Sequence, residues 1–299
     1  MKILLLGKNG QVGWELQRSL AVLGDVVALG REEENGLCGD LADVQRLRET
    51  VHAVQPDAIV NAAAYTAVDR AESEPERAFA INAHAPRMLA EEAQRLDAWL
   101  LHYSTDYVFD GTGQAPWREG DATGPLSVYG ASKLAGEQAI VESGVKHLIL
   151  RTSWVYSARG HNFLKTMLRL GRELPELRVV DDQIGAPTGA ELLADASAHA
   201  LHHAALGSAA FSGTYHLAAR GHTSWHAYAS LIFERAQALR PELPLAKLLP
   251  IASAQYPTPA ARPRNSRLNV SAFETTFDLE LPPWQKGVER VVDELLLGA

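Results

Sequence analysis

The chain has 299 residues, a formal net charge of −8 at pH 7 and 46% hydrophobic residues, a composition that excludes collagen, coiled-coil and disordered proteins. The acidic balance argues against nonspecific nucleic-acid binding, which needs a basic surface, but it permits a local anion site. The single cysteine, Cys38, excludes an intramolecular disulfide and fits a reducing, cytoplasmic location. The first apolar run, residues 3–6, is too short for a secretion signal. No stretch reaches the ~18 apolar residues of a membrane span, so we expect no membrane association.

Short apolar runs alternate with amphipathic stretches through the first half of the chain. The apolar runs predict strands at residues 3–6, 26–29, 58–60, 99–103 and 148–150. The amphipathic stretches predict helices at 12–23, 44–54, 75–96 and 128–142. Pro86 should kink or split the third of these helices. Strands that alternate with helices in this way form βαβ units, and strands that are apolar throughout lie in a sheet covered on both faces.

The second half is less regular. We predict a strand at 214–217 and helices at 163–170, 190–206, 224–239 (capped by Ser224) and 288–297, whereas the proline-rich residues 241–268 should form loops. The whole pattern predicts an α/β protein, a doubly wound parallel sheet (Rossmann) with a smaller α/β substrate-binding lobe. Residues 1–155 would form the dinucleotide-binding domain and also receive later strands and the 190–206 helix. Residues 156–299 would supply mainly the substrate-binding lobe.

A glycine-rich turn follows the first predicted strand and opens the first helix. Gly7, Gly10 and Gly13 stand there in a GxxGxxG pattern. In this setting the first glycine permits the tight turn, the second lets the backbone approach a pyrophosphate, and the third allows close packing of helix and strand. The free amides at the helix start would face the phosphate charge, so the turn predicts dinucleotide binding.

The end of the second strand bears on the choice of cofactor. NAD-selective sites usually carry an acidic residue at this point, and none stands here. Arg31 could pair with the 2′-phosphate of NADP, although Glu32, Glu33 and Glu34 follow directly and would repel a phosphate. We expect NADPH as the cofactor, with NADH also able to serve, and Asp40 as an acceptor for the adenine amino group.

Tyr129 and Lys133 are four residues apart at the start of a predicted helix, which places them on one face. The lysine ammonium would stabilise the tyrosine phenolate and lower its pKa, so that the tyrosine could exchange a proton with an alcohol or ketone. Ser104 and Thr105 lie just past the fourth strand, at the sheet edge where such folds bind ligands. Either hydroxyl could reach the same carbonyl oxygen, whereas His102 is expected in the core.

The glycine loop with Tyr129 and Lys133 resembles the extended short-chain dehydrogenase/reductase superfamily. Longer motifs are more specific and read GKNGQVGWEL at 7–16, VNAAAYTAVD at 60–69, HYSTDYVFDG at 102–111, DDQIGAPT at 181–188 and RPRNSRL at 262–268. These motifs span nearly the whole chain and resemble the dTDP-4-dehydrorhamnose reductase family.

This resemblance implies NADPH-dependent reduction of the 4-keto group of dTDP-4-dehydro-L-rhamnose, the last step to dTDP-L-rhamnose. It implies Tyr129 as the proton donor, Lys133 as a ligand of the nicotinamide ribose and Thr105 as the third catalytic residue. The positions that match sugar contacts are Thr105, Asp106 and Trp154. With those argued above, the candidate cofactor-binding residues are Gly7, Gly10, Gln11, Val12, Gly13, Arg31, Asp40, Leu41, Ala62, Ala63, Ala64, Tyr65, Thr66, Tyr103, Tyr129 and Lys133.

Some members of the family are homodimers with a structural Mg²⁺ at the interface, and the residues that match its ligands are Glu15 and Glu191. Carboxylates suit this hard cation. In the proline-rich loop, the guanidinium groups of Arg262, Arg264 and Arg267 have the fork geometry that could clamp a nucleotide diphosphate.

Two alternatives stay open on the sequence. One is another nucleotide-sugar reductase or epimerase of the superfamily; a 4,6-dehydratase fits less well, because it carries an acid pair after its threonine and here Tyr107 follows Asp106. The other is a noncatalytic regulatory subunit of the same fold. The presence of Thr105, Tyr129 and Lys133 together favours the reductase.

Overall fold

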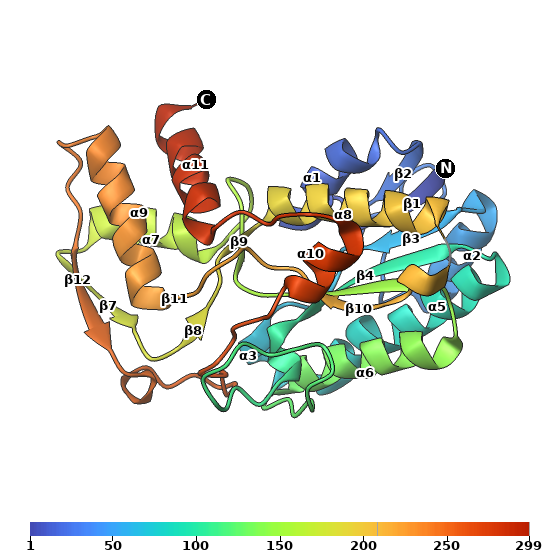
Figure 1. The fold of residues 1–299 in the computed structure, drawn as a ribbon, viewed down its shortest axis with the longest axis horizontal. Helices are drawn as coiled ribbons and strands as arrows, with labels where there is room; N and C mark the ends of the chain where they lie inside the picture. Colours follow the sequence, from blue (N-terminus) through green and yellow to red (C-terminus); the bar gives the residue numbers. More distant parts are fainter. Residues whose placement is uncertain (208, 299) are drawn as a thin grey trace.

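The computed structural model describes residues 1–207 and 209–298, and its main feature is a parallel sheet (Figure 1). Within the described residues this sheet has six strands, in the spatial order β2 (Asp25–Leu29), β1 (Lys2–Leu6), β3 (Ala58–Asn61), β4 (Trp99–Thr105), β5 (His147–Thr152) and β10 (Gly213–His216). All neighbours pair in parallel. The predicted α/β class and doubly wound parallel sheet are therefore confirmed.

Helices cover both faces of the sheet because its strands are apolar on both sides. On one face lie α1 (Gln11–Leu20) and α8 (Ala190–Leu206), and on the other α2 (Val44–Val54), α5 (Ala85–Arg95) and α6 (Val128–Ser143) (Figure 1). Alternate residues of β1 show the division: Ile3 packs with the first pair of helices, and Leu4 packs with the other three. Each fully buried leucine or isoleucine contributes about 1.5–3 kcal/mol of transfer free energy to this packing.

A smaller lobe lies beside the sheet and has its own core, centred on Tyr156, Tyr228 and Trp284. Its helices are α7 (Phe163–Glu173), α9 (Trp225–Leu239) and α11 (Trp284–Leu297). Three short strand pairs complete it, namely β7 (Glu176–Val180) with β12 (Lys247–Ile251), β8 (Ile184–Gly185) with β11 (Thr223–Ser224), and β6 (Val155–Tyr156) with β9 (Thr188–Gly189). From this lobe α10 (Ser271–Phe277) returns to the sheet and packs near β10 and α8 (Figure 1).

One prediction about these elements is confirmed and another was wrong in part. The helix expected at 75–96 is divided, as Pro86 indicated, into α4 (Pro75–Phe79), a π-helical turn (Ala80–His84) and α5, and Pro86 stands in the first turn of α5, where proline costs little. Residues 241–268 include the strand β12, although only loops were expected there. Pro250 is tolerated in β12 because this strand pairs on one side only, with β7.

Other boundaries agree closely with the sequence pattern. The helices at 44–54 and 190–206 begin and end at the predicted residues, and Ser224 caps α9 by accepting a hydrogen bond from the Ala227 amide. A short helix, α3 (Val68–Ala71), was not predicted. Within the described ranges, no helix combines the length and apolar character needed to cross a membrane.

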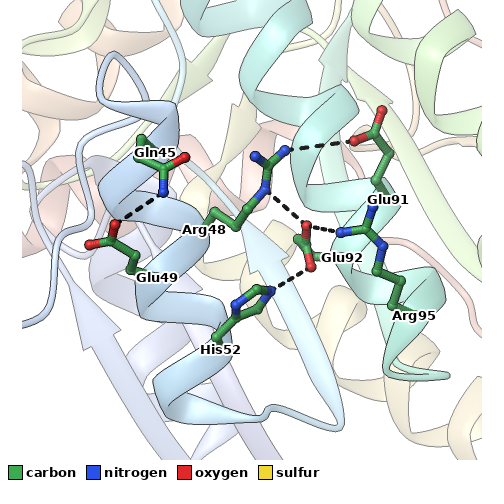
Figure 2. Close-up of polar contacts among 7 residues, drawn as sticks. All are labelled: Gln45, Arg48, Glu49, His52, Glu91, Glu92 and Arg95. Carbon is green, nitrogen blue, oxygen red and sulfur yellow. Dashed lines mark hydrogen bonds and ion pairs between the residues drawn. The ribbon is translucent and has the colours of Figure 1, made fainter.

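A buried carboxylate ties α2 to α5 (Figure 2). Glu92 on α5 is 1% exposed, and its oxygens lie 2.9 Å from Arg48 Nε, 2.8 Å from His52 Nε2 and 2.6 Å from Arg95 Nη1. A carboxylate removed from water needs such partners, because an unpaired buried charge is strongly destabilising. The cluster therefore fixes how these two helices pack against the sheet.

Replacing Glu92 by glutamine should lower the free energy of unfolding by about 1–3 kcal/mol in urea titrations. The amide keeps the shape of the side chain but turns an N–H toward a cation. The matched control is Glu49→Gln, on the exposed side of α2, where Glu49 contacts only Gln45 among the residues of Figure 2. That variant should stay within about 0.5 kcal/mol of the parent, and equal losses in the two variants would contradict the role of the cluster.

Candidate active site

A cavity of about 920 Å³ opens at the carboxyl ends of the main strands. Its wall includes the residues that directly follow β1, β2 and β3, together with Tyr103 and Ser104 near the end of β4 and Thr152 at the end of β5. Strands β2 and β3 lie on opposite sides of β1, so the winding of the sheet reverses here, which is where open α/β sheets bind ligands. Every candidate cofactor-binding residue except Gly13 lines this cavity.

The glycine turn is held by backbone contacts that exclude larger side chains. Gly7 has φ +90°, and a Cβ there would lie 2.8 Å from the Ala63 nitrogen. A Cβ on Gly13 would lie 2.0 Å from the Gly7 carbonyl oxygen, so Gly13 serves helix–strand packing behind the cavity wall. Among the described residues no side chain caps the start of α1, which leaves its first amides directed at the cavity.

The region after β2 would receive the adenosine end of a dinucleotide. Arg31 and Asp40 both line the cavity. Of the three glutamates expected to repel a phosphate, Glu33 pairs with Arg46 at 2.7 Å and Glu34 pairs with Lys8 at 2.5 Å, whereas Glu32 lines the cavity. Pairing neutralises much of the repulsion that the sequence predicted around Arg31.

Tyr129 stands at the start of α6, where Ser127 caps the helix. Its ring packs edge-on against Tyr107 with centroids 5.7 Å apart. Burial raises the pKa of Tyr129 to about 12, and a side-chain hydrogen bond with Thr105 partly opposes this rise. The expected lowering of this pKa by Lys133 is therefore not what the structure shows.

Lys133 reaches a different set of partners. Its Nζ lies 2.5 Å from the Tyr103 carbonyl oxygen and 3.0 Å from His102 Nε2. Burial lowers the pKa of Lys133 to about 8, while the Glu137 carboxylate acts to raise it. The lysine thus lies at the cavity wall in surroundings that disfavour its charge.

The three candidate sugar contacts lie outside the cavity lining. Thr105 accepts a hydrogen bond from the Tyr107 amide at 3.2 Å, and Asp106 is buried, which raises its pKa to about 6. Trp154 has φ +49° and stacks on Trp225 with ring centroids 3.6 Å apart, at the boundary of the smaller lobe. A binding site that uses all three would have to extend from the cavity toward that lobe.

Several cavity residues were not predicted. Thr152 is one of them, whereas Ser104 was expected as an alternative to Thr105; both line the cavity, and their buried hydroxyls have no partner among the described residues. Arg70 and Arg77 also line it, as do Gly160 and His161 from the segment after β6. Position at a strand end could have identified Thr152, but no local pattern marks residues that reach the site from another lobe.

Two of the three arginines of the proline-rich loop are engaged with protein groups. Arg262 pairs with Asp69 at 2.8 Å, and Arg267 Nη1 lies 3.0 Å from the Asn265 side-chain oxygen. Neither of them, nor Arg264, is part of the cavity lining. These arginines therefore do not face the cavity, and a diphosphate bound there would not contact them.

The two predicted magnesium ligands, Glu15 and Glu191, lie near each other, and the described residues show no metal site around them. Burial and the nearby Glu191 carboxylate raise the pKa of Glu15, but Glu191 is itself paired with Arg290. In the part of the chain that the structure describes, no group of three or more His, Cys, Asp or Glu side chains is arranged to hold a metal ion. Since a carboxylate paired with a guanidinium has little charge left for a cation, the predicted Mg²⁺ site is not supported.

Comparison with known proteins gives a consistent result. The model of the RmlD substrate binding domain matches residues 1–297. The dTDP-4-dehydrorhamnose reductase of Escherichia coli (strain K12) is 55% identical over 295 residues, which cover 99% of this chain and 98% of that protein. The Salmonella typhimurium enzyme of the same name is 54% identical over 295 residues, with the same coverage. A crystal structure of dTDP-4-dehydrorhamnose reductase from Bacillus anthracis in complex with NADP has a TM-score of 0.88 and 36% identity, covering 98% of this chain and 99% of that one.

Adding one methyl group at Gly13 should disrupt the glycine turn. The Cβ of a Gly13→Ala variant would collide with the Gly7 carbonyl, and both groups are backbone that cannot move freely. We expect NADPH binding, measured by fluorescence titration, to weaken about tenfold or more, with a lower melting temperature. Gly120→Ala is the control, since nothing lies within 4 Å of its Cβ. Unchanged binding by the Gly13 variant would show that the close approach is not required.

Proposed function

Because the chain belongs to the dTDP-4-dehydrorhamnose reductase family, we propose that it reduces the 4-keto group of dTDP-4-dehydro-L-rhamnose with NADPH to give dTDP-L-rhamnose. The observation that carries this proposal is the 55% identity over 99% of the chain, with Tyr129 and Lys133 on the wall of the cavity. The relative solved in complex with NADP supports NADPH as the reductant.

The cavity fits a dinucleotide. Its glycine turn offers uncapped helix amides to a pyrophosphate, and the unpartnered hydroxyls of Ser104 and Thr152 offer hydrogen bonds deeper inside. The predicted ligands divide by region into the turn (Gly7, Gly10, Gln11, Val12), the adenosine end (Arg31, Asp40, Leu41) and the nicotinamide side (Ala62, Ala63, Ala64, Tyr65, Thr66, Tyr103, Lys133). When bound, the reduced nicotinamide supplies the hydride that C4 of the sugar accepts.

Tyr129 supplies the proton. With a pKa near 12, its hydroxyl stays protonated throughout the neutral range. It can donate this proton to the oxygen at C4 as the carbon–oxygen double bond is reduced. Thr105 orients that hydroxyl through its hydrogen bond and can also contact the same oxygen. One hydride at carbon and one proton at oxygen complete the conversion of ketone to alcohol.

Lys133 would hold the nicotinamide ribose and place positive charge beside Tyr129. Its pKa of about 8 leaves the amine mostly protonated at pH 7 and mostly neutral above pH 9. Loss of this charge removes a group that stabilises the negative charge developing on the tyrosine oxygen. The rate of reduction should therefore fall as the pH rises through about 8.

We further propose that the sugar and its nucleotide bind between the cavity and the smaller lobe. Trp154, with its indole stacked on Trp225, presents an aromatic surface that suits the apolar face of a deoxysugar, and Asp106 would contact a sugar hydroxyl. In this arrangement residues 1–155, together with β10 and α8, would form the dinucleotide-binding domain, and residues 156–299 would supply mainly the substrate lobe. A homodimer and a cytoplasmic location stay predictions.

The Tyr129→Phe variant should lose at least about 10²–10⁴-fold in kcat, because it lacks the proton donor, and should still bind NADPH. The measurement is NADPH consumption with dTDP-4-dehydro-L-rhamnose, beside fluorescence titration of the cofactor. Tyr256→Phe, at an exposed tyrosine outside the cavity lining, is the control and should keep full activity. If the parent chain binds NADPH but turns over no substrate, another nucleotide sugar or a regulatory role becomes the better reading.

Arg31 should determine the preference between the two cofactors. Removing its guanidinium in Arg31→Ala should raise KM for NADPH about tenfold, equivalent to roughly 1.4 kcal/mol, and leave KM for NADH almost unchanged. The 2′-phosphate is the only difference between the two ligands, so the ratio of the KM values isolates this contact. An equal effect on both cofactors would place Arg31 at the adenine or at the surface.

A further inference from the structure

A buried line of side chains leads from β3 through β4 to the active-site lysine. Asn61 and His102 are each 1% exposed, and Lys133 is 2% exposed. Asn61 Nδ2 lies 3.1 Å from His102 Nδ1, and His102 Nε2 lies 3.0 Å from Lys133 Nζ. The reaction described above uses neither Asn61 nor His102, so the reason for two polar groups in the core has to be sought in this line.

The backbone determines the direction of these hydrogen bonds. The Ala63 amide donates to Asn61 Oδ1 at 3.1 Å, so this oxygen faces Ala63 and the NH₂ group faces His102. His102 Nδ1 must then be an acceptor, and a neutral imidazole with Nδ1 free carries its proton on Nε2. The ring is neutral, because burial and the neighbouring Lys133 hold the pKa of His102 well below its usual range. The Nε2–H is therefore aimed at Lys133 Nζ.

This direction restricts the charge of the lysine. An ammonium group is a donor only, whereas an uncharged amine can accept the Nε2–H and still donate to the Tyr103 carbonyl at 2.5 Å. If Nζ is protonated, His102 has to move its proton to Nδ1, where it meets the NH₂ group of Asn61. The bonding pattern thus couples the charge of Lys133 to the tautomer of His102.

We propose that His102, oriented by Asn61, is a positioning residue for Lys133, which it holds at the cavity wall and whose protonation it opposes. Among the other charged and titratable groups around this site, Glu137 on α6 acts on the lysine directly and is itself paired with Arg151 of β5 at 2.6 Å. Tyr129, also on α6, packs against Tyr107 of the 3₁₀ turn after β4, and the Asp106 carboxylate of that turn opposes ionisation of Tyr129. Glu137 favours the charged lysine, so His102 and Glu137 act in opposite directions.

The direct test follows the titration of Lys133 without using catalysis. The chain has seven lysines, so ¹³Cε-lysine labelling gives few NMR resonances, and the one lost in Lys133→Met identifies this residue. In the parent chain it should titrate near pH 8. In His102→Leu, which removes the opposing N–H, the midpoint should rise by about half a pH unit or more. His102→Gln can place an amide N–H at the Nε2 position and should restore the parent midpoint.

Asn61→Asp is a second variant of nearly the same shape. A carboxylate can accept from both the Ala63 amide and His102 Nδ1–H, which turns Nε2 into an acceptor for the ammonium. The midpoint of Lys133 should then rise further than in His102→Leu, and this variant tests the proposal even if the leucine variant does not fold. His216→Gln is the control, because His216 is as buried as His102 but contacts the Trp117 carbonyl and lies outside the cavity lining. It should leave the Lys133 midpoint unchanged.

The catalytic meaning of the contact rests on the proposed function. In the reductase assay, His102→Leu should shift the basic limb of the pH profile of kcat to higher pH, together with the NMR midpoint. It should also lower kcat at pH 7 about threefold to tenfold, because the amine is no longer held in place at the cavity wall, with KM for the sugar unchanged. A folded His102→Leu or Asn61→Asp variant whose Lys133 midpoint equals that of the parent would overturn the proposal. A parent chain that reduces no sugar would overturn the proposed function alone, since the titration would still report on His102.

Discussion

The close approach of backbone at the first strand–helix turn is the constraint on which the rest of the site depends. Hydrogen is the only substituent that fits at Gly13, because a Cβ would lie 2.0 Å from the Gly7 carbonyl oxygen, and Gly7 is in turn pressed against the chain that follows β3. This packing directs the first amides of α1 into the cavity, next to the ends of the other strands. The turn and the sheet topology are linked, because Gly7 contacts the chain after β3 and its amide donates to the Leu29 carbonyl of β2, and these two strands lie on either side of β1.

Across the cavity from the glycine turn, burial has more effect than pairing on the pKa values of the α6 side chains. Tyr129 and Lys133 share a helix face, yet the pKa of the tyrosine rises and that of the lysine falls, since a site with little water disfavours both charged forms. The π-helical turn before α5 helps to build the cavity wall on this side. The Asn82 side chain of this turn accepts a hydrogen bond from the Tyr65 amide at 2.8 Å and donates one to the Tyr65 carbonyl at 3.0 Å. It also donates to the Ser132 hydroxyl on α6. The loop after β3 and the catalytic helix are thus held in register by a single amide.

The smaller lobe is joined to the cofactor loop itself. Gln11 Oε1 accepts hydrogen bonds from Asn162 at 2.8 Å and from Ser157 at 3.3 Å, and the segment between those residues brings Gly160 and His161 into the cavity wall. On the other side, Asp69 and Arg262 connect α3 to the proline-rich loop. A dinucleotide in the cavity would contact both lobes, and it would then link cofactor binding to the placement of the proposed sugar site.

By itself the sequence determined the α/β class, the strands β1 to β5, the bounds of α2 and α8, and the residue types on the cavity wall, because apolar periodicity, glycine spacing and helix caps are local signals. The tertiary structure decided everything that joins distant segments. The pairing of β7 with β12, the π-helical turn and the contribution of His161 depend on neighbours that no local pattern identifies. The partner of Lys133 is the clearest case. Spacing pointed to Tyr129 on the same helix, but the fold brings His102, 31 residues earlier, to its amine, and burial then reverses the expected direction of the tyrosine pKa shift.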